Sequence, residues 1–224
     1  MSISAIEHIT RRRRDKFGLD EHGKLIGVNP LASDLRNSID HLAEGLYTRN
    51  AHFIFELIQN AEDNEYGSNV KPSLTFKLLR DDPTSTVGAD GALIVENNEA
   101  GFTEKNIEAI CAVGKSTKEK AKGFIGEKGI GFKSVFRVTS RPFIFSNGYC
   151  ISLPEVHEAT GLGYIVPEWV ENIPAQIDQS VTSIVLPLDV TDFGHEEVRK
   201  MLTDIEPESI LFLYKLLPSH SNLD

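Results

Sequence analysis

Residues 53–65, FIFELIQNAEDNE, carry two different patterns at the spacing of an α-helix. At about 100° per residue, Glu56, Asn60 and Asp63 fall within about 60° of one another. The apolar residues that predict the packing face lie on another side of the same helix: Ile54, Leu57, Ile58 and Ala61. One helix therefore presents two carboxylates and an amide on a stripe that is separate from its core-facing side.

The polar stripe has no basic partner within its own segment. A solvated stripe would be expected to include Lys or Arg at i,i+4 spacing. None occurs between Phe53 and Tyr66. We therefore expect a cation to reach this helix from elsewhere, most simply as a metal ion. Taken alone, Asn60 is equally compatible with a role in capping or bridging helices.

Composition sets the broad class of the protein. The chain has 224 residues, of which 40% are hydrophobic and 25% charged, as in ordinary globular domains. A formal net charge of −10 disfavours nucleic-acid phosphates as the main ligand. The sequence contains no apolar run of membrane-spanning length, and Cys111 and Cys150 lack metal-ligand spacing. We expect an intracellular protein, cytoplasmic or nuclear, with reduced thiols and no membrane partner.

Hydrophobic periodicity predicts helices mainly in the first part of the chain and strands mainly in the second. The expected helices span about 2–17, 33–47, 53–67, 103–113, 132–138 and 196–205, with another after 207. The expected strands span about 73–79, 92–96, 143–145, 149–153, 164–169 and 183–188. Helices followed by a mostly antiparallel sheet predict an α/β fold, as a two-layer sandwich.

Residues 114–131 are rich in glycine and lysine, which favours a phosphate-binding loop. A Walker A loop does not fit, because Ala109 stands where the first glycine before Gly114-Lys115-Ser116 belongs. A Rossmann fingerprint does not fit either, because Gly126, Gly129 and Gly131 follow the order G-x-x-G-x-G after a lysine-rich segment.

A third arrangement fits. Glu-x-x-x-Asn-x-x-Asp from Glu56, Gly101-Phe102-Thr103 after a strand, the glycines from Gly126, and Thr-x-Ile-x-Leu from Thr182 follow one another in the chain. This series resembles the ATP-binding domains of gyrase, heat-shock chaperones, histidine kinases and MutL (GHKL). Residues 29–66 and 126–139 look closest to the NO VEIN-like branch of that superfamily, with sacsin as a more distant relative.

The resemblance implies a Bergerat fold, with helices on one face of a mainly antiparallel mixed sheet. It implies an N-terminal helix and connector at 1–30 and an ATP-binding domain at 31–224, with a lid at about 112–128. The activity it implies is Mg-ATP binding with weak, Mg²⁺-dependent ATP hydrolysis. Lid closure would then act as a conformational switch for protein partners.

The same resemblance assigns roles to single residues. Glu56 corresponds to the general base that polarises water, and Asn60 to the neutral amide that binds Mg²⁺ beside the phosphates. Asp63 corresponds to a nucleotide contact made through solvent. Thr182 corresponds to the hydroxyl that contacts adenine. The remaining nucleotide-binding positions are Asn97, Gly101, Phe102, Lys115, Ser116, Gly126, Lys128, Gly129, Ile130, Gly131 and Phe132.

The chain differs from the superfamily at the adenine-binding aspartate. Asn97 stands in its place, and Glu99 replaces the first glycine that follows it. An amide oxygen accepts a hydrogen bond from the adenine amino group, whereas the amide nitrogen serves a carbonyl acceptor. The sequence is therefore compatible with more than one base.

Other functions remain as alternatives. A nucleotide-binding or interaction module without hydrolysis is one, because superfamily ATPases use a further domain to supply a cation to the γ-phosphate. The partners implied are ATP and ADP, such a domain or partner protein, and a nucleotide-dependent dimer. A histidine kinase is weaker, since His41 and His52 belong to helices around the site. Roles on DNA rest on the run Arg11–Arg14, for which a solvated helix end is the favoured explanation.

Overall fold

The computed structural model describes residues 4–27, 35, 52–112, 131–189, 193–206, 208 and 213–216. Within these ranges the strands form a six-stranded sheet in the order β1-β2-β6-β3-β4-β5, and every described pairing is antiparallel. The strands are β1 (Leu74–Leu79), β2 (Ala89–Asn97), β3 (Phe143–Ser146), β4 (Tyr149–Ser152), β5 (Glu168–Trp169) and β6 (Thr182–Asp189). The α/β class is confirmed. The expected sheet was mainly antiparallel but mixed, and the described pairings include no parallel pair.

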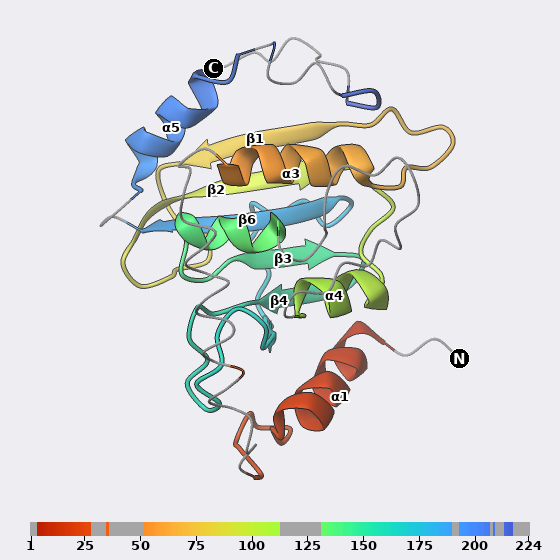
Figure 1. The fold of residues 1–224 in the computed structure, drawn as a ribbon, viewed down its shortest axis with the longest axis vertical. Helices are drawn as coiled ribbons and strands as arrows, with labels where there is room; N and C mark the ends of the chain where they lie inside the picture. Colours follow the sequence, from red (N-terminus) through yellow and green to blue (C-terminus); the bar gives the residue numbers. More distant parts are fainter. Residues whose placement is uncertain are drawn as a thin grey trace.

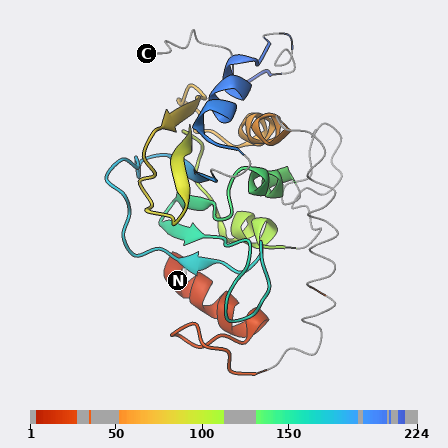
Figure 2. The ribbon, with the colours of Figure 1, turned by 90° about the vertical axis from the view of Figure 1, so that its left-hand side faces the viewer.

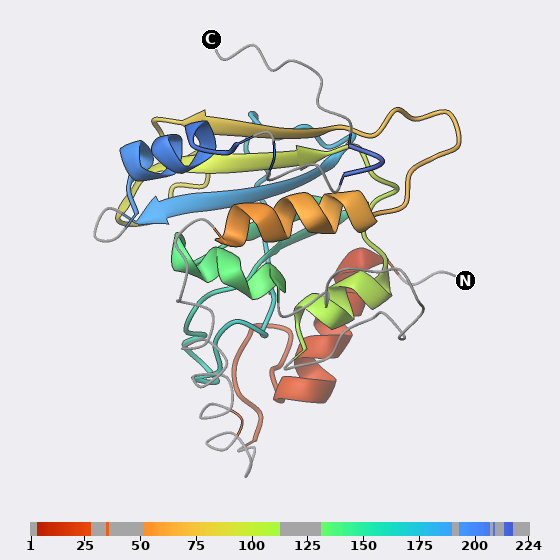
Figure 3. The ribbon, with the colours of Figure 1, turned by 45° about the horizontal axis from the view of Figure 1, so that its top comes forward.

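Helices cover one face of the sheet (Figures 1 and 2). They are α1 (Ala5–Phe17), α3 (His52–Asp63), α4 (Glu104–Ile110), the 3-10 helix η1 (Gly131–Arg137) and α5 (His195–Thr203). Figure 3 shows α3 and η1 side by side, and α4 beside α1. No helix in the described part of the chain is both long and apolar enough to cross a membrane.

Alternation along the strands separates two apolar cores. Leu93 and Val95 of β2 face the helices in the main core, whereas Ala92 and Ile94 belong to a smaller cluster. The same alternation in β6 places Val185 in the smaller cluster and Leu186 in the main one. Successive side chains of a strand point to opposite faces, so the polar residues that continue the helix-facing row lie beside α3 and α4.

Helix α3 keeps the predicted packing face but ends earlier than expected. Its buried residues are Phe53, Ile54, Leu57, Ile58 and Ala61. The carbonyl of Ala61 accepts from the Asn64 backbone N–H (3.1 Å) and from the Tyr66 hydroxyl (2.7 Å). Continued helix would use that carbonyl for residue 65, so the two competing donors favour an end at Asp63.

The expected helix 132–138 is present as the 3-10 helix η1, in which the Ser134 hydroxyl bonds the Gly131 carbonyl (2.6 Å). Two other sequence-based boundaries were wrong. The expected strand 164–169 is reduced to Glu168–Trp169, and its expected first residue, Tyr164, has a left-handed φ of 64° that is incompatible with extended backbone. Helix α4 stops at Ile110. The expected helix 33–47 lies outside the described residues except for Leu35.

The arginine run of α1 is partly structural rather than wholly solvated. Arg12 is buried and pairs with Glu108 of α4, and it donates to the Cys111 carbonyl (2.8 Å). Burial raises the pKa of Glu108, but hydrogen bonds from Arg12 and Lys16 outweigh it and hold that pKa at about 2. Arg14, by contrast, is exposed, as expected of a solvated helix end.

Candidate functional site

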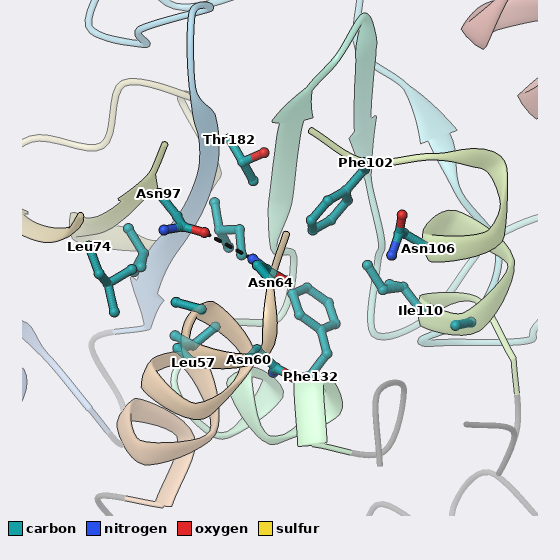
Figure 4. A pocket seen from close by; sticks show the side chains of 14 residues that line it. Leu57, Asn60, Asn64, Leu74, Asn97, Phe102, Asn106, Ile110, Phe132 and Thr182 are labelled. Atoms are coloured by element: carbon teal, nitrogen blue, oxygen red, sulfur yellow. Dashed lines mark hydrogen bonds between the residues drawn. The ribbon is translucent and has the colours of Figure 1, made fainter. Parts of the chain in front are cut away.

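A pocket opens between the helix-facing side of the sheet and helices α3, α4 and η1 (Figure 4). About 630 Å³ of non-atom space lies within it, a figure that includes solvent at its open mouth. Its apolar wall includes Leu57, Phe102 and Phe132. The polar side chains in its lining are Asn60, Asn64, Asn97, Asn106 and Thr182. No charged side chain lines this pocket among the described residues.

Asn97 and Thr182 face each other at one end of the pocket, which we call the base end because the sequence resemblance predicts a nucleobase there. They are register partners in β2 and β6, and both are buried. The Asn97 Nδ2 donates to the Tyr66 hydroxyl (2.8 Å) and to the Ser73 carbonyl (2.7 Å). Its Oδ1 accepts from Asn64 Nδ2 (2.9 Å). The amide therefore has a defined orientation at the end of β2.

Thr182 belongs to a directed chain of hydrogen bonds. Its hydroxyl donates to Glu99 Oε1 (2.6 Å), so the bond with Ser146 runs from the serine hydroxyl to Thr182. Ser146 in turn accepts from the Phe102 backbone N–H (2.8 Å). Glu99, which stands where the resemblance predicts a glycine, thus accepts a hydrogen bond from Thr182. This series of hydrogen bonds links β6, β3 and the turn after β2.

The turn before Phe102 requires its glycine. Gly101 has a φ of 89°, and a Cβ there would lie 2.7 Å from the Asn147 Cβ. Asn147 also donates to the Phe102 carbonyl (3.0 Å). Gly101 therefore shapes the base end by allowing this close approach, and Phe102 lines the pocket.

Glu56 and Gly131 meet next to the pocket, at what we call the phosphate end because the sequence resemblance predicts the nucleotide phosphates there. A Cβ on Gly131 would overlap the Glu56 carboxylate, so only glycine permits this contact between α3 and η1. His52 lies one turn earlier, with its Nε2 3.4 Å from Glu56 Oε1. The Glu56 side chain keeps 20% of its exposure, which leaves the carboxylate accessible to solvent.

A buried lysine connects two of the segments that form the pocket. Lys133 of η1 donates to the Ile110 carbonyl at the end of α4 (2.7 Å) and contacts the Tyr164 carbonyl (3.3 Å). Burial lowers the pKa of Lys133 to about 8. Because Ile110 and Phe132 both line the pocket, this lysine joins two of its walls.

The structure brings together several of the predicted site residues. Asn60, Asn97, Phe102, Phe132 and Thr182 line a single pocket. Asp63 lies at the end of α3 but is not part of that lining. The expected lid at about 112–128 lies outside the described residues except for Ala112. The predicted nucleotide-binding residues outside them are Lys115, Ser116, Gly126, Lys128, Gly129 and Ile130.

Sequence reasoning missed Asn64, Tyr66 and Ser146. Asn64 follows Asn60 at i+4, which is a signal for a shared helix face. Ser146 continues the helix-facing row of β3, two residues after the buried Ile144. No local pattern indicated Tyr66, because its contact with Asn97 joins residues 31 positions apart. Burial, with smaller contributions from the nearby Glu99 and Glu62 charges, raises the pKa of Tyr66.

The chain has recognisable relatives. The Sacsin domain family matches residues 31–163. Protein NO VEIN of Arabidopsis thaliana is 36% identical over 224 aligned residues, covering 91% of this chain and 8% of that protein. Sacsin of Homo sapiens is 33% identical over 128 residues, covering 54% of this chain and 3% of that protein. The chain thus spans less than a tenth of the length of either relative.

Proposed function

This chain belongs to the Sacsin domain family, and we propose that it binds Mg-ATP and hydrolyses it slowly. One observation carries the proposal. Residues from separate segments that the GHKL resemblance assigns to a nucleotide gather around one pocket, namely Asn60, Asn97, Phe102, Phe132 and Thr182. Their convergence is a property of the fold, because they span more than half of the sequence.

The pocket suits a nucleobase in shape and chemistry. Its apolar wall would cover the faces of a planar ring, which favours aromatic ligands. At the base end, Asn97 and Thr182 would supply hydrogen-bonding groups to a ring edge. The sugar would extend from this end toward Asn60, which lines the same pocket.

The phosphate end would hold the remainder of the ligand. Asn60 supplies a neutral amide oxygen, a ligand type that Mg²⁺ accepts beside phosphate oxygens. When bound, Mg²⁺ would neutralise part of the phosphate charge. Gly131 brings backbone to Glu56 without a side chain between them. We propose that Glu56 orients a water molecule and accepts its proton, since its carboxylate is solvent-accessible.

The remaining part of the proposal concerns the expected lid. Closure of residues 112–128 over the nucleotide would change the surface that a partner protein meets, so that bound ATP shifts a conformational equilibrium. A further domain or partner would supply a basic side chain to the γ-phosphate. These two elements rest on the family resemblance alone.

The test compares two isosteric substitutions, one on α3 and one just beyond its end. Glu56→Gln should retain ATP affinity and lower steady-state phosphate release by on the order of 10²- to 10⁴-fold. The matched control is Glu65→Gln, which makes the same change of charge at an exposed side chain. Calorimetric titration with ATP and ADP, with and without Mg²⁺, measures binding. If neither ATP nor ADP binds, the proposal is overturned. Unchanged turnover in Glu56→Gln would remove Glu56 from its role.

A further inference from the structure

Asn97 stands where the superfamily pattern has an aspartate, and its neighbours determine which end of its amide faces the pocket. The Ser73 carbonyl can only accept a hydrogen bond, so the group 2.7 Å from it is the Asn97 amide nitrogen. The Tyr66 hydroxyl donates to the Ala61 carbonyl (2.7 Å), which leaves its oxygen to accept from the same nitrogen. Both protons of the Asn97 NH₂ group are therefore used.

The Asn97 oxygen is consequently turned the other way. Figure 4 shows Oδ1 directed toward Asn64 and the interior of the pocket, with the nitrogen directed away from it. Asn64 Nδ2 occupies one of its lone pairs at 2.9 Å. A carbonyl oxygen has two lone pairs, so Oδ1 retains capacity for a donor on a ligand.

Thr182 supports the same polarity. Its proton is directed to Glu99, and it accepts the Ser146 proton, so toward a ligand it presents only a lone pair. The base end therefore offers acceptors from both of its facing residues. A ring edge that carries a carbonyl oxygen at this position would meet repulsion instead of a hydrogen bond.

We infer that Tyr66, together with the Ser73 carbonyl, is a positioning element that makes Asn97 select purines with an amino group at position 6. This inference rests on the proposed function and adds to it the source of base selectivity. Without the tyrosine hydroxyl, the amide would be held on its nitrogen side by Ser73 alone. Rotation of the amide would then present NH₂ to the pocket and admit a 6-oxo purine.

The clean ligand pair for this inference is ATP and ITP, because inosine has oxygen at position 6 and no amino group at position 2. We expect the wild-type chain to bind ATP at least about tenfold tighter than ITP, as measured by calorimetry. Tyr66→Phe should reduce this ratio by about fivefold, which is the contribution of one neutral hydrogen bond. Tyr149→Phe is the matched control, since its hydroxyl bonds His8 away from the pocket.

A second background separates positioning from simple loss of structure. In Asn97→Asp, rotation of the side chain exchanges one carboxylate oxygen for another, so the pocket meets an acceptor in either orientation. Adding Tyr66→Phe to Asn97→Asp should therefore leave the ATP-to-ITP ratio unchanged. A merely structural tyrosine would lower both affinities in both backgrounds without changing either ratio.

The outcomes are distinguishable from failure of the proposed function. If neither nucleotide binds the wild-type chain, the nucleotide proposal and this inference both fall. If both bind with equal affinity, the nucleotide proposal stands and the inference is wrong. An equal change of ratio on Tyr66→Phe in both backgrounds also overturns it, because the effect would not pass through the orientation of Asn97.

Discussion

The two ends of the pocket are held in place by different means. At the base end, Asn97, Thr182 and their neighbours are linked by hydrogen bonds between strand ends and turns, and Asn97 and Thr182 are each about 95% or more buried. At the phosphate end, the contact between Glu56 and Gly131 depends on the absence of a side chain. The hydrogen bonds at the base end fix the orientation of side chains, whereas the glycine at the phosphate end allows η1 to approach the Glu56 carboxylate closely.

This difference gives each end its own expected failure. Loss of a hydrogen-bonding group at the base end should change the affinity for the nucleotide and the preference among bases. Loss of space at the phosphate end should displace the carboxylate proposed to orient water. Given the proposed activity, damage at the base end should therefore appear in affinity and damage at the phosphate end in turnover.

The largest effect is expected from Gly131→Ala. The added methyl group overlaps the Glu56 carboxylate, which must move away. Because misplacement of a catalytic group by about 1 Å costs on the order of 10²-fold, phosphate release should fall by about that factor. ATP affinity by calorimetry should change by less than about threefold in comparison. If Gly131→Ala lowers ATP affinity and leaves turnover unchanged, the phosphate end does not act on turnover as expected.

A smaller effect, on the other end, is expected from Thr182→Val. The substitution keeps the shape but removes the donor to Glu99 and the acceptor for Ser146 in a buried position. Unsatisfied buried groups cost roughly 1–3 kcal/mol, so urea unfolding should show a loss of that size. ATP affinity should fall by about tenfold. The maximal rate of phosphate release should stay near the wild-type value, and a collapse of that rate would contradict the comparison.

The smallest effect concerns the wall that both ends share. Burial lowers the pKa of Lys133 to about 8 in the folded chain, below the ordinary 10.5. Between these two pH values the unfolded chain binds more protons than the folded one, so this lysine makes stability rise with pH. The free energy of unfolding should gain at most about 1.4 kcal/mol per pH unit relative to Lys133→Met.

Chemical denaturation at several pH values between 8 and 10.5 measures that difference. Lys77→Met is the control, because the Lys77 side chain is 46% exposed and pairs with Glu96 on the sheet surface. A wild-type chain and a Lys133→Met variant with parallel pH profiles would remove the buried lysine as the cause.

Local periodicity was sufficient to predict much of the fold. The packing face of α3 and the strands near 74–79 and 182–189 follow from the spacing of apolar residues within each segment. The errors came where a hydrogen bond or a backbone torsion overrides the apolar pattern. The Tyr66 hydroxyl takes a carbonyl that α3 would otherwise use, and Tyr164 is left-handed where a strand was expected to begin.

The sequence by itself determined which residue types are present in the site and their order along the chain. It gave Glu56 and Asn60 their common helical face, because spacing on a helix depends only on local geometry. Only the tertiary structure decided the orientation of Asn97, since its partners Tyr66 and Ser73 lie 31 and 24 positions away. An amide has two chemically opposite ends, and only its folded surroundings select between them.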